Sequence, residues 1–125
     1  MMINNINIKK LLLSIIIFIV LDSIYLYLFS PHFKQQIFDV QNSQLEFNFI
    51  PAVICYFVLI FGLNYFILQR DNNILDAVLL GLVIYSVYET TNMTIFKNWN
   101  IKSVLIDSIW GGILFGLTTF IITLL

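Results

Sequence analysis

The chain has 125 residues, of which 60% are hydrophobic and 10% are charged, and its formal net charge is −1. A soluble domain of this size needs polar side chains to cover its surface, so the composition favours an integral membrane protein. The six basic residues are scattered singly or in pairs, which excludes the basic patch of a nucleic-acid-binding protein.

Residues 11–29 form the first predicted membrane-spanning helix. This apolar run follows Lys9 and Lys10 and is long enough to cross about 30 Å of hydrocarbon. A cleavable signal peptide is the competing interpretation, and it is disfavoured because no small-residue cleavage site follows the run. Pro31 predicts the end of the helix, since proline lacks an amide hydrogen. The polar stretch 32–48 is then a loop, part of which has the spacing of a short helix on the membrane surface.

Three further apolar runs, at residues 50–68, 75–92 and 104–125, predict three further spans. Pro51 lies in the first turn of one of them, where a missing amide hydrogen costs little. Because the connections are short, successive helices should be antiparallel neighbours. We therefore expect an all-α fold in which a single domain, residues 1–125, forms a multi-pass four-helix transmembrane bundle with both termini on the same side.

Basic residues do not decide which way the bundle crosses the membrane. The predicted topology places three of them on each side: Lys9, Lys10 and Arg70 with the termini, and Lys34, Lys97 and Lys102 opposite. The positive-inside rule compares such counts, so the tie leaves both orientations open.

Three acids, Asp22, Glu89 and Asp107, fall in the same half of the membrane when depth is counted at about 1.5 Å per residue. A carboxylate within hydrocarbon costs about 2.5 to 3.5 kcal/mol on insertion scales, so each acid should turn toward the interior of the bundle. The predicted spans contain no Lys or Arg that could pair with them. The sequence therefore predicts that three acids distant along the chain meet at a common depth.

Other side chains at helical spacing on the third and fourth predicted spans accompany the acids. Two stripes of residues repeat at helical spacing and can face each other. They are Gly81, Tyr85, Tyr88 or Glu89, and Asn92 on the third span, and Asp107, Trp110 or Gly111, Leu114 and Thr118 on the fourth. We predict a binding or transport site for a proton, a cation or a cationic small molecule, with the three acids as ligands or proton carriers. Its hydrogen-bonding or cation-stacking wall would consist of Tyr85, Tyr88, Asn92 and Trp110.

A structural role is the alternative, because polar groups in membrane helices also act as interhelical hydrogen bonds of about 0.6 to 2 kcal/mol. The protein would then be an accessory subunit or assembly factor of a larger membrane complex. The small residues Ser108, Gly112 and Gly116 permit close helix approach, either within the chain or in a homo-oligomer.

Enzymatic chemistry has little support in the sequence. It contains no recognisable catalytic motif, metal-ligand cluster or phosphate-binding glycine loop, so we assign no catalytic residue, metal or cofactor. Lipid chemistry that uses Glu89 or Asp107 as acid or base stays open, although the sequence offers it no nucleophile.

Several motifs go beyond hydrophobic composition. The most specific are the run Tyr88-Glu89-Thr90-Thr91-Asn92 and the later Asp107-x-x-Trp110-Gly111, and they are accompanied by Leu21-Asp22, Pro51-Ala52, Tyr56, Gly62, Gly81, Tyr85 and Trp99. With these motifs the chain resembles, over nearly its whole length, the small membrane proteins grouped as domain of unknown function 2177. That family usually has Asp at the position of Glu89 and Pro at the position of Asn100. The resemblance implies a four-helix integral membrane protein and brings no established activity.

Overall fold

The computed structural model describes residues 6–125, which form four long helices and no strands. The helices are α1 (Ile8–Gln41), α2 (Phe49–Leu63), α3 (Ile74–Ile95) and α4 (Ile101–Leu124). A single π-helical segment, η2 (Asn64–Leu68), continues α2 without a break. Each of the four, with η2 counted as part of α2, is long and apolar enough to cross a membrane.

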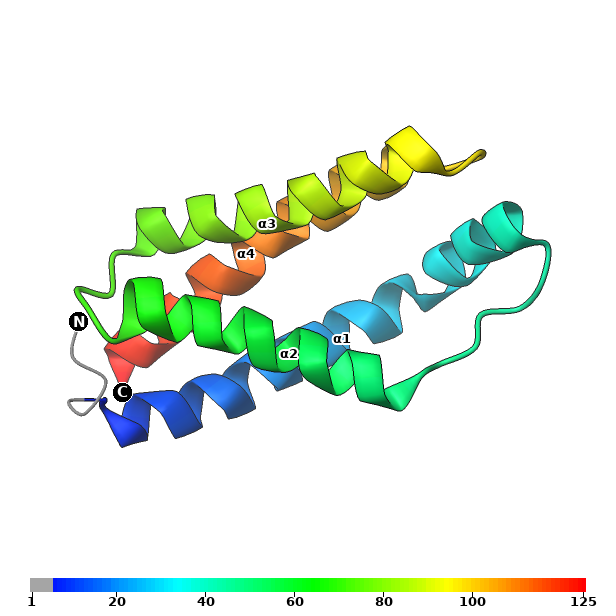
Figure 1. Ribbon diagram of the computed structural model, residues 1–125. Coiled ribbons are helices and arrows are strands. Elements are labelled where there is room, and N and C mark those ends of the chain that lie inside the picture. Colours follow the sequence, from blue (N-terminus) through cyan, green and yellow to red (C-terminus); the bar gives the residue numbers. More distant parts are fainter. Residues whose placement is uncertain (1–5) are drawn as a thin grey trace.

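The helices run alternately in opposite directions, so the beginning of α1 and the end of α4 lie at the same end of the bundle (Figure 1). We call this the terminal end, and we call the opposite end, where residues 42–48 and 96–100 connect the helices, the loop end. The predicted all-α transmembrane bundle, with termini on one side, is confirmed. So is its place in the membrane as a multi-pass protein.

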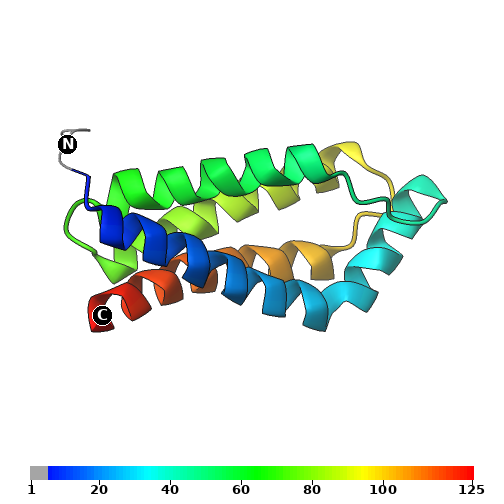
Figure 2. The ribbon, with the colours of Figure 1, turned by 90° about the horizontal axis from the view of Figure 1, so that it is seen from below.

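Pro31 does not end the first helix. α1 continues to Gln41 and stops where Asn42 adopts a left-handed conformation, with φ of 58° and its amide donating to the Phe38 carbonyl oxygen at 2.8 Å. The last turns of α1 are angled away from the rest of the helix (Figure 2), as expected where proline removes a backbone hydrogen bond. The predicted boundary at residue 29 was therefore wrong, and the loop is restricted to residues 42–48.

The contact between α3 and α4 is the most extensive in the described chain. A Cβ atom on Gly81 would overlap the carbonyl group of Gly111, and one on Gly111 would overlap the ring of Tyr85. Only glycine at both positions allows the two backbones to approach this closely. The two helices thus form a hairpin whose separation is fixed by backbone atoms.

The predicted small-residue stripe of α4 is buried inside the chain. Ser108, Gly112 and Gly116 all have little exposed surface, and the two glycines face Val78 of α3. Of the two roles that the sequence left open for this stripe, packing within the chain is the one the structure displays.

α2 is the helix with the least support from its neighbours. Its buried side chains, before η2 begins, are Ile60 and Leu63, which join a core that includes Phe18 and Phe115. Most of its remaining side chains are large, apolar and exposed. Such a surface suits a helix that faces lipid hydrocarbon.

Candidate functional site

Asp22 joins three helices through its carboxyl group. It is only 7% exposed on α1, and it accepts hydrogen bonds from the Tyr56 hydroxyl of α2 and from Trp110 Nε1 of α4, the latter at 2.9 Å. A buried carboxyl group needs such donors, because water is absent at this depth.

Asp107 makes the complementary contact between α1 and α4. The Tyr25 hydroxyl donates to its Oδ1 at 3.0 Å, and the Tyr25 ring stacks on Trp110 with centroids 4.6 Å apart. Each helix therefore contributes one acid and one aromatic donor that lies three residues later. Because α1 and α4 are antiparallel, the acid of each helix meets the donor of the other.

Glu89 is the most deeply buried acid, at 1% exposure on α3. Trp99, in the connection between α3 and α4, donates from Nε1 to Glu89 Oε1 at 3.0 Å. The Glu89 carboxyl group also faces that of Asp107, close enough for a hydrogen bond when one of them carries a proton.

These contacts, which involve all four helices, are together called the aromatic–acid network. Its members are Asp22, Tyr25, Tyr56, Glu89, Trp99, Asp107 and Trp110. The network lies in the half of the bundle nearer the loop end, at the depth where the sequence placed the three acids.

The residues matched by the family comparison include every member of this network. The sequence model of the family described as "Predicted membrane protein (DUF2177)" matches residues 7–124. The chain belongs to this family. No curated protein and no solved structure matches it. The resemblance read from the sequence motifs is therefore confirmed, and membership in DUF2177 carries a membrane location but no activity.

The proposed wall residues of the DUF2177 protein take different positions. Tyr85 is half-buried beside Gly111, and Asn92 is buried on the same face of α3. Tyr88, by contrast, is 57% exposed. Neighbouring helical residues point about 100° apart, so the inward direction of Glu89 turns Tyr88 outward.

Sequence reasoning named Tyr56 only among the family motifs and gave it no role in the site, and it missed a polar cluster at the loop end of the DUF2177 protein. Gln36, at 3% exposure, donates from Nε2 to the Asn98 carbonyl oxygen at 2.9 Å. Its Oε1 accepts from the Asn100 amide at 2.9 Å and from the Ser103 hydroxyl at 2.6 Å. Gln36 thus fastens the last turns of α1 to the connection between α3 and α4.

The same cluster contains a serine and a histidine in contact, since His32 Nε2 lies 2.8 Å from Ser103 Oγ. The Ser103 hydroxyl donates to Gln36, so its proton points away from the imidazole. Ser103 is also completely buried, so no substrate could reach its hydroxyl group without rearrangement of the helices. This geometry suits a structural contact and does not suit an activated nucleophile.

A metal ion finds no ready set of ligands in the described part of the DUF2177 protein. Residues 6–125 contain no group of three or more His, Cys, Asp or Glu side chains placed to hold one. Although Asp22, Glu89 and Asp107 lie at a common depth, aromatic N–H and O–H donors separate Asp22 from the other two.

Proposed function

We propose that this membrane protein binds a proton between the carboxyl groups of Glu89 and Asp107. The observation that carries the proposal is that the buried Glu89 carboxyl group lies beside that of Asp107, which is half-buried. Two adjacent carboxylates would repel each other, and the apolar runs 11–29, 50–68, 75–92 and 104–125 contain no Lys or Arg to offset their charge. A proton held by the pair relieves this repulsion and supplies the hydrogen that joins the two groups.

The remainder of the network supports a proton more than a larger cation. Asp107 accepts from Tyr25, and Asp22 accepts from Tyr56 and Trp110, so these aromatic donors already surround the acids. A cationic small molecule would have to displace several of them. A proton needs no additional volume, and the Tyr25 hydroxyl already donates a hydrogen bond to one member of the pair, Asp107.

Infrared spectroscopy of the protein in lipid vesicles tests the proposal directly. A protonated carboxyl group has a C=O stretching band that is distinct from the carboxylate bands, and the band should disappear in both Glu89→Gln and Asp107→Asn. Asp76→Asn is the matched control, because Asp76 is exposed in the first turn of α3. Persistence of the band in both pair variants would refute the proposal.

Proton flux into the same vesicles, driven by a potassium diffusion potential, then distinguishes binding from transport. Transport through the pair requires that flux in the wild type exceed that of empty vesicles and fall to that level in Glu89→Gln. Equal flux in the wild type and in Glu89→Gln restricts the role to proton binding.

A structural role is the second candidate, and one observation favours it. Each acid of the network accepts a hydrogen bond from an aromatic donor on another element, which holds the helices together. An accessory subunit would copurify from its native membrane with a stoichiometric partner, and the acid variants would lose that partner. Recovery of the chain alone, stable and with the infrared band described above, argues against this candidate.

A further inference from the structure

A polar pocket of about 570 Å³ lies at the loop end, where the last turns of α1 meet the connection between α3 and α4 (Figure 2). We call it the loop-end pocket. The described residues that line it are Phe38, Asp39, Asn42, Asn98, Trp99 and Asn100. All of them except Trp99 are exposed. The pocket therefore has the polar groups and the volume that are needed to hold water.

Trp99 is in contact with both this pocket and the buried acid pair. It lines the pocket, it is 8% exposed, and its indole Nε1 donates to Glu89 Oε1 at 3.0 Å. Glu89 lies six residues before the end of α3, which is about 9 Å along the helix. The pair is thus close to the loop end, and Trp99 lies between the two.

Gln36 holds Trp99 in this place through both of its neighbours in the chain. Gln36 Nε2 donates to the Asn98 carbonyl oxygen, and the Asn100 amide donates to Gln36 Oε1, both at 2.9 Å. The connection therefore keeps the indole against Glu89, which has 1% of its surface exposed.

A layer of apolar side chains lies on the terminal side of the network. It consists of Phe18, Leu63, Leu114 and Phe115, which have no exposed surface and belong to one hydrophobic core. Glu89 lies fifteen residues, or about 22 Å, from the beginning of α3 at that end. A proton that came from the terminal end would have to cross this apolar layer, where a charge is costly.

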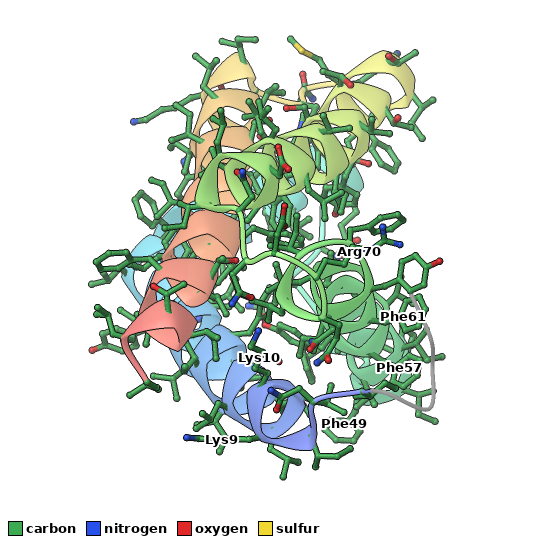
Figure 3. All side chains as sticks on the ribbon, turned by 90° about the vertical axis from the view of Figure 1, so that its left-hand side faces the viewer. Lys9, Lys10, Phe49, Phe57, Phe61 and Arg70 are labelled. Atoms are coloured by element: carbon green, nitrogen blue, oxygen red, sulfur yellow. The ribbon has the colours of Figure 1, made fainter. Side chains whose placement is uncertain are left out.

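The charges at the two ends also differ. Among the described residues that line the loop-end pocket, Asp39 alone is charged. The lysines of that end, Lys34, Lys97 and Lys102, do not line it. At the terminal end, Lys10 points toward the middle of the bundle (Figure 3), and its Nζ donates to a backbone carbonyl oxygen at 3.0 Å. A carboxylate attracts protons to the loop-end pocket, whereas an ammonium group repels them from the terminal end.

We propose that the acid pair exchanges its proton with the solution at the loop end, through the loop-end pocket, and that the Trp99 indole is the barrier to this exchange. This proposal rests on the proton-binding function proposed above and adds the side from which the proton comes. When the indole moves aside, a hydronium ion in the pocket transfers a proton to a carboxylate oxygen of Glu89 and becomes water, and release is the reverse. The indole N–H is a donor only, so Trp99 acts by excluding water and does not carry the proton itself.

The first test is hydrogen–deuterium exchange of the protonated carboxyl group in lipid vesicles, because its infrared band shifts when deuterium replaces the proton. Trp99→Ala should speed the shift at least about tenfold, which corresponds to a barrier lower by about 1.4 kcal/mol. Trp99→Phe keeps a ring without the N–H group and should exchange more slowly than Trp99→Ala. Leu63→Ala is the control for general loosening, since it removes a fully buried side chain of the apolar layer, and it should exchange at the wild-type rate.

Three results of this test would overturn the assignment of the barrier to the indole ring. They are equal exchange rates in the wild type and Trp99→Ala, a rate in Trp99→Phe equal to that in Trp99→Ala, and acceleration in Leu63→Ala equal to that in Trp99→Ala.

The second test measures access to position 89 without the need for a bound proton. In a chain whose single cysteine is removed by Cys55→Ser, Glu89→Cys places a thiol at the pair, and a water-soluble methanethiosulfonate reagent reports whether water reaches it. The reaction should be slow while Trp99 is present and at least about tenfold faster with Trp99→Ala. Leu63→Cys combined with Trp99→Ala is the control, and it should stay unreactive.

The two measurements separate the access route from proton binding. Absence of the infrared band from the wild type refutes proton binding by the pair, and the thiol reaction then decides the route alone. The route is overturned, even where the band is present, if Glu89→Cys reacts equally with and without Trp99→Ala or if Leu63→Cys reacts as fast as Glu89→Cys.

Discussion

The ring of Tyr25 lies parallel to the indole of Trp110, with an interplanar angle of 4° and a centroid separation of 4.6 Å. Each of these two aromatic residues also donates a hydrogen bond to an acid of the opposite helix, Tyr25 to Asp107 and Trp110 to Asp22. The stack therefore fixes the positions of both donors at once. It makes the α1–α4 interface depend on side-chain orientation as well as on packing.

Tyr25→Phe tests the hydrogen bond to Asp107 while it keeps an aromatic ring on Trp110. We expect a loss of stability of about 0.6 to 1.7 kcal/mol, the range measured for interhelical hydrogen bonds in membranes. Thermal unfolding in detergent measures the effect. Tyr27→Phe is the control, since Tyr27 is 81% exposed, and it should unfold at the wild-type temperature. Equal stability of the two variants would contradict the assigned role of Tyr25.

Gly81→Ala tests the backbone contact between α3 and α4. The added methyl group would meet the carbonyl group of Gly111, so the helices must separate, at a cost of about 1 to 3 kcal/mol for overpacking. Gly62→Ala is the matched control on α2. A Cβ there has no atom within 4 Å, and alanine should stabilise the helix by about 0.5 to 1 kcal/mol. Unfolding temperatures should therefore change in opposite directions.

Gln36→Leu tests the fastening of α1 to the loop end. Leucine fills most of the volume but leaves the Asn100 amide without its acceptor, which costs about 1 to 3 kcal/mol. Faster proteolysis of the connection 96–100, together with a lower unfolding temperature, would reveal the loss of this contact. The neighbouring Gln35 is exposed and bonds only to Asp39 within its own helix, so Gln35→Leu should leave both measurements nearly unchanged.

A double-mutant cycle of Asp22→Asn and Tyr56→Phe tests how α2 is held. Because the Tyr56 hydroxyl donates to Asp22, the two substitutions should be non-additive by about 0.5 to 1.7 kcal/mol in unfolding free energy. Tyr65 lies on the same continuous helix as Tyr56, and Asp22→Asn combined with Tyr65→Phe should give additive effects. An additive result for the Tyr56 cycle would show that the contact contributes nothing to the position of α2.

The spans could be predicted from the sequence because hydrophobicity over some twenty residues is a local property. The common depth of the acids also followed from counting along antiparallel helices. The end of α1 could not be predicted in this way. Pro31 favours a break, and the turns beyond it persist through contacts of Gln36 with residues more than sixty positions later. Local helix propensity does not reflect such long-range contacts, so it could not predict where α1 ends.

The partners of the acids were predictable only in part. Tyr25 and Asp22 belong to one visible stripe of α1, and Trp110 and Asp107 are spaced in the same way on α4. Tyr56 stands in a span without an acid, so nothing in its neighbourhood marks it as a donor. The orientation of Tyr88 was also ambiguous, because it and Glu89 compete for the same face of α3, and burial of the acid settles the direction.

The glycine contact between α3 and α4 has a consequence for motion. Backbone atoms in direct contact cannot slide past one another by exchanging rotamers, so this hairpin must move as a rigid unit. α2 and η2 are attached to α1 through side-chain hydrogen bonds and a few apolar side chains, and they have no such backbone contact. α2 is therefore the helix that can be displaced relative to the others with the least disruption of packing.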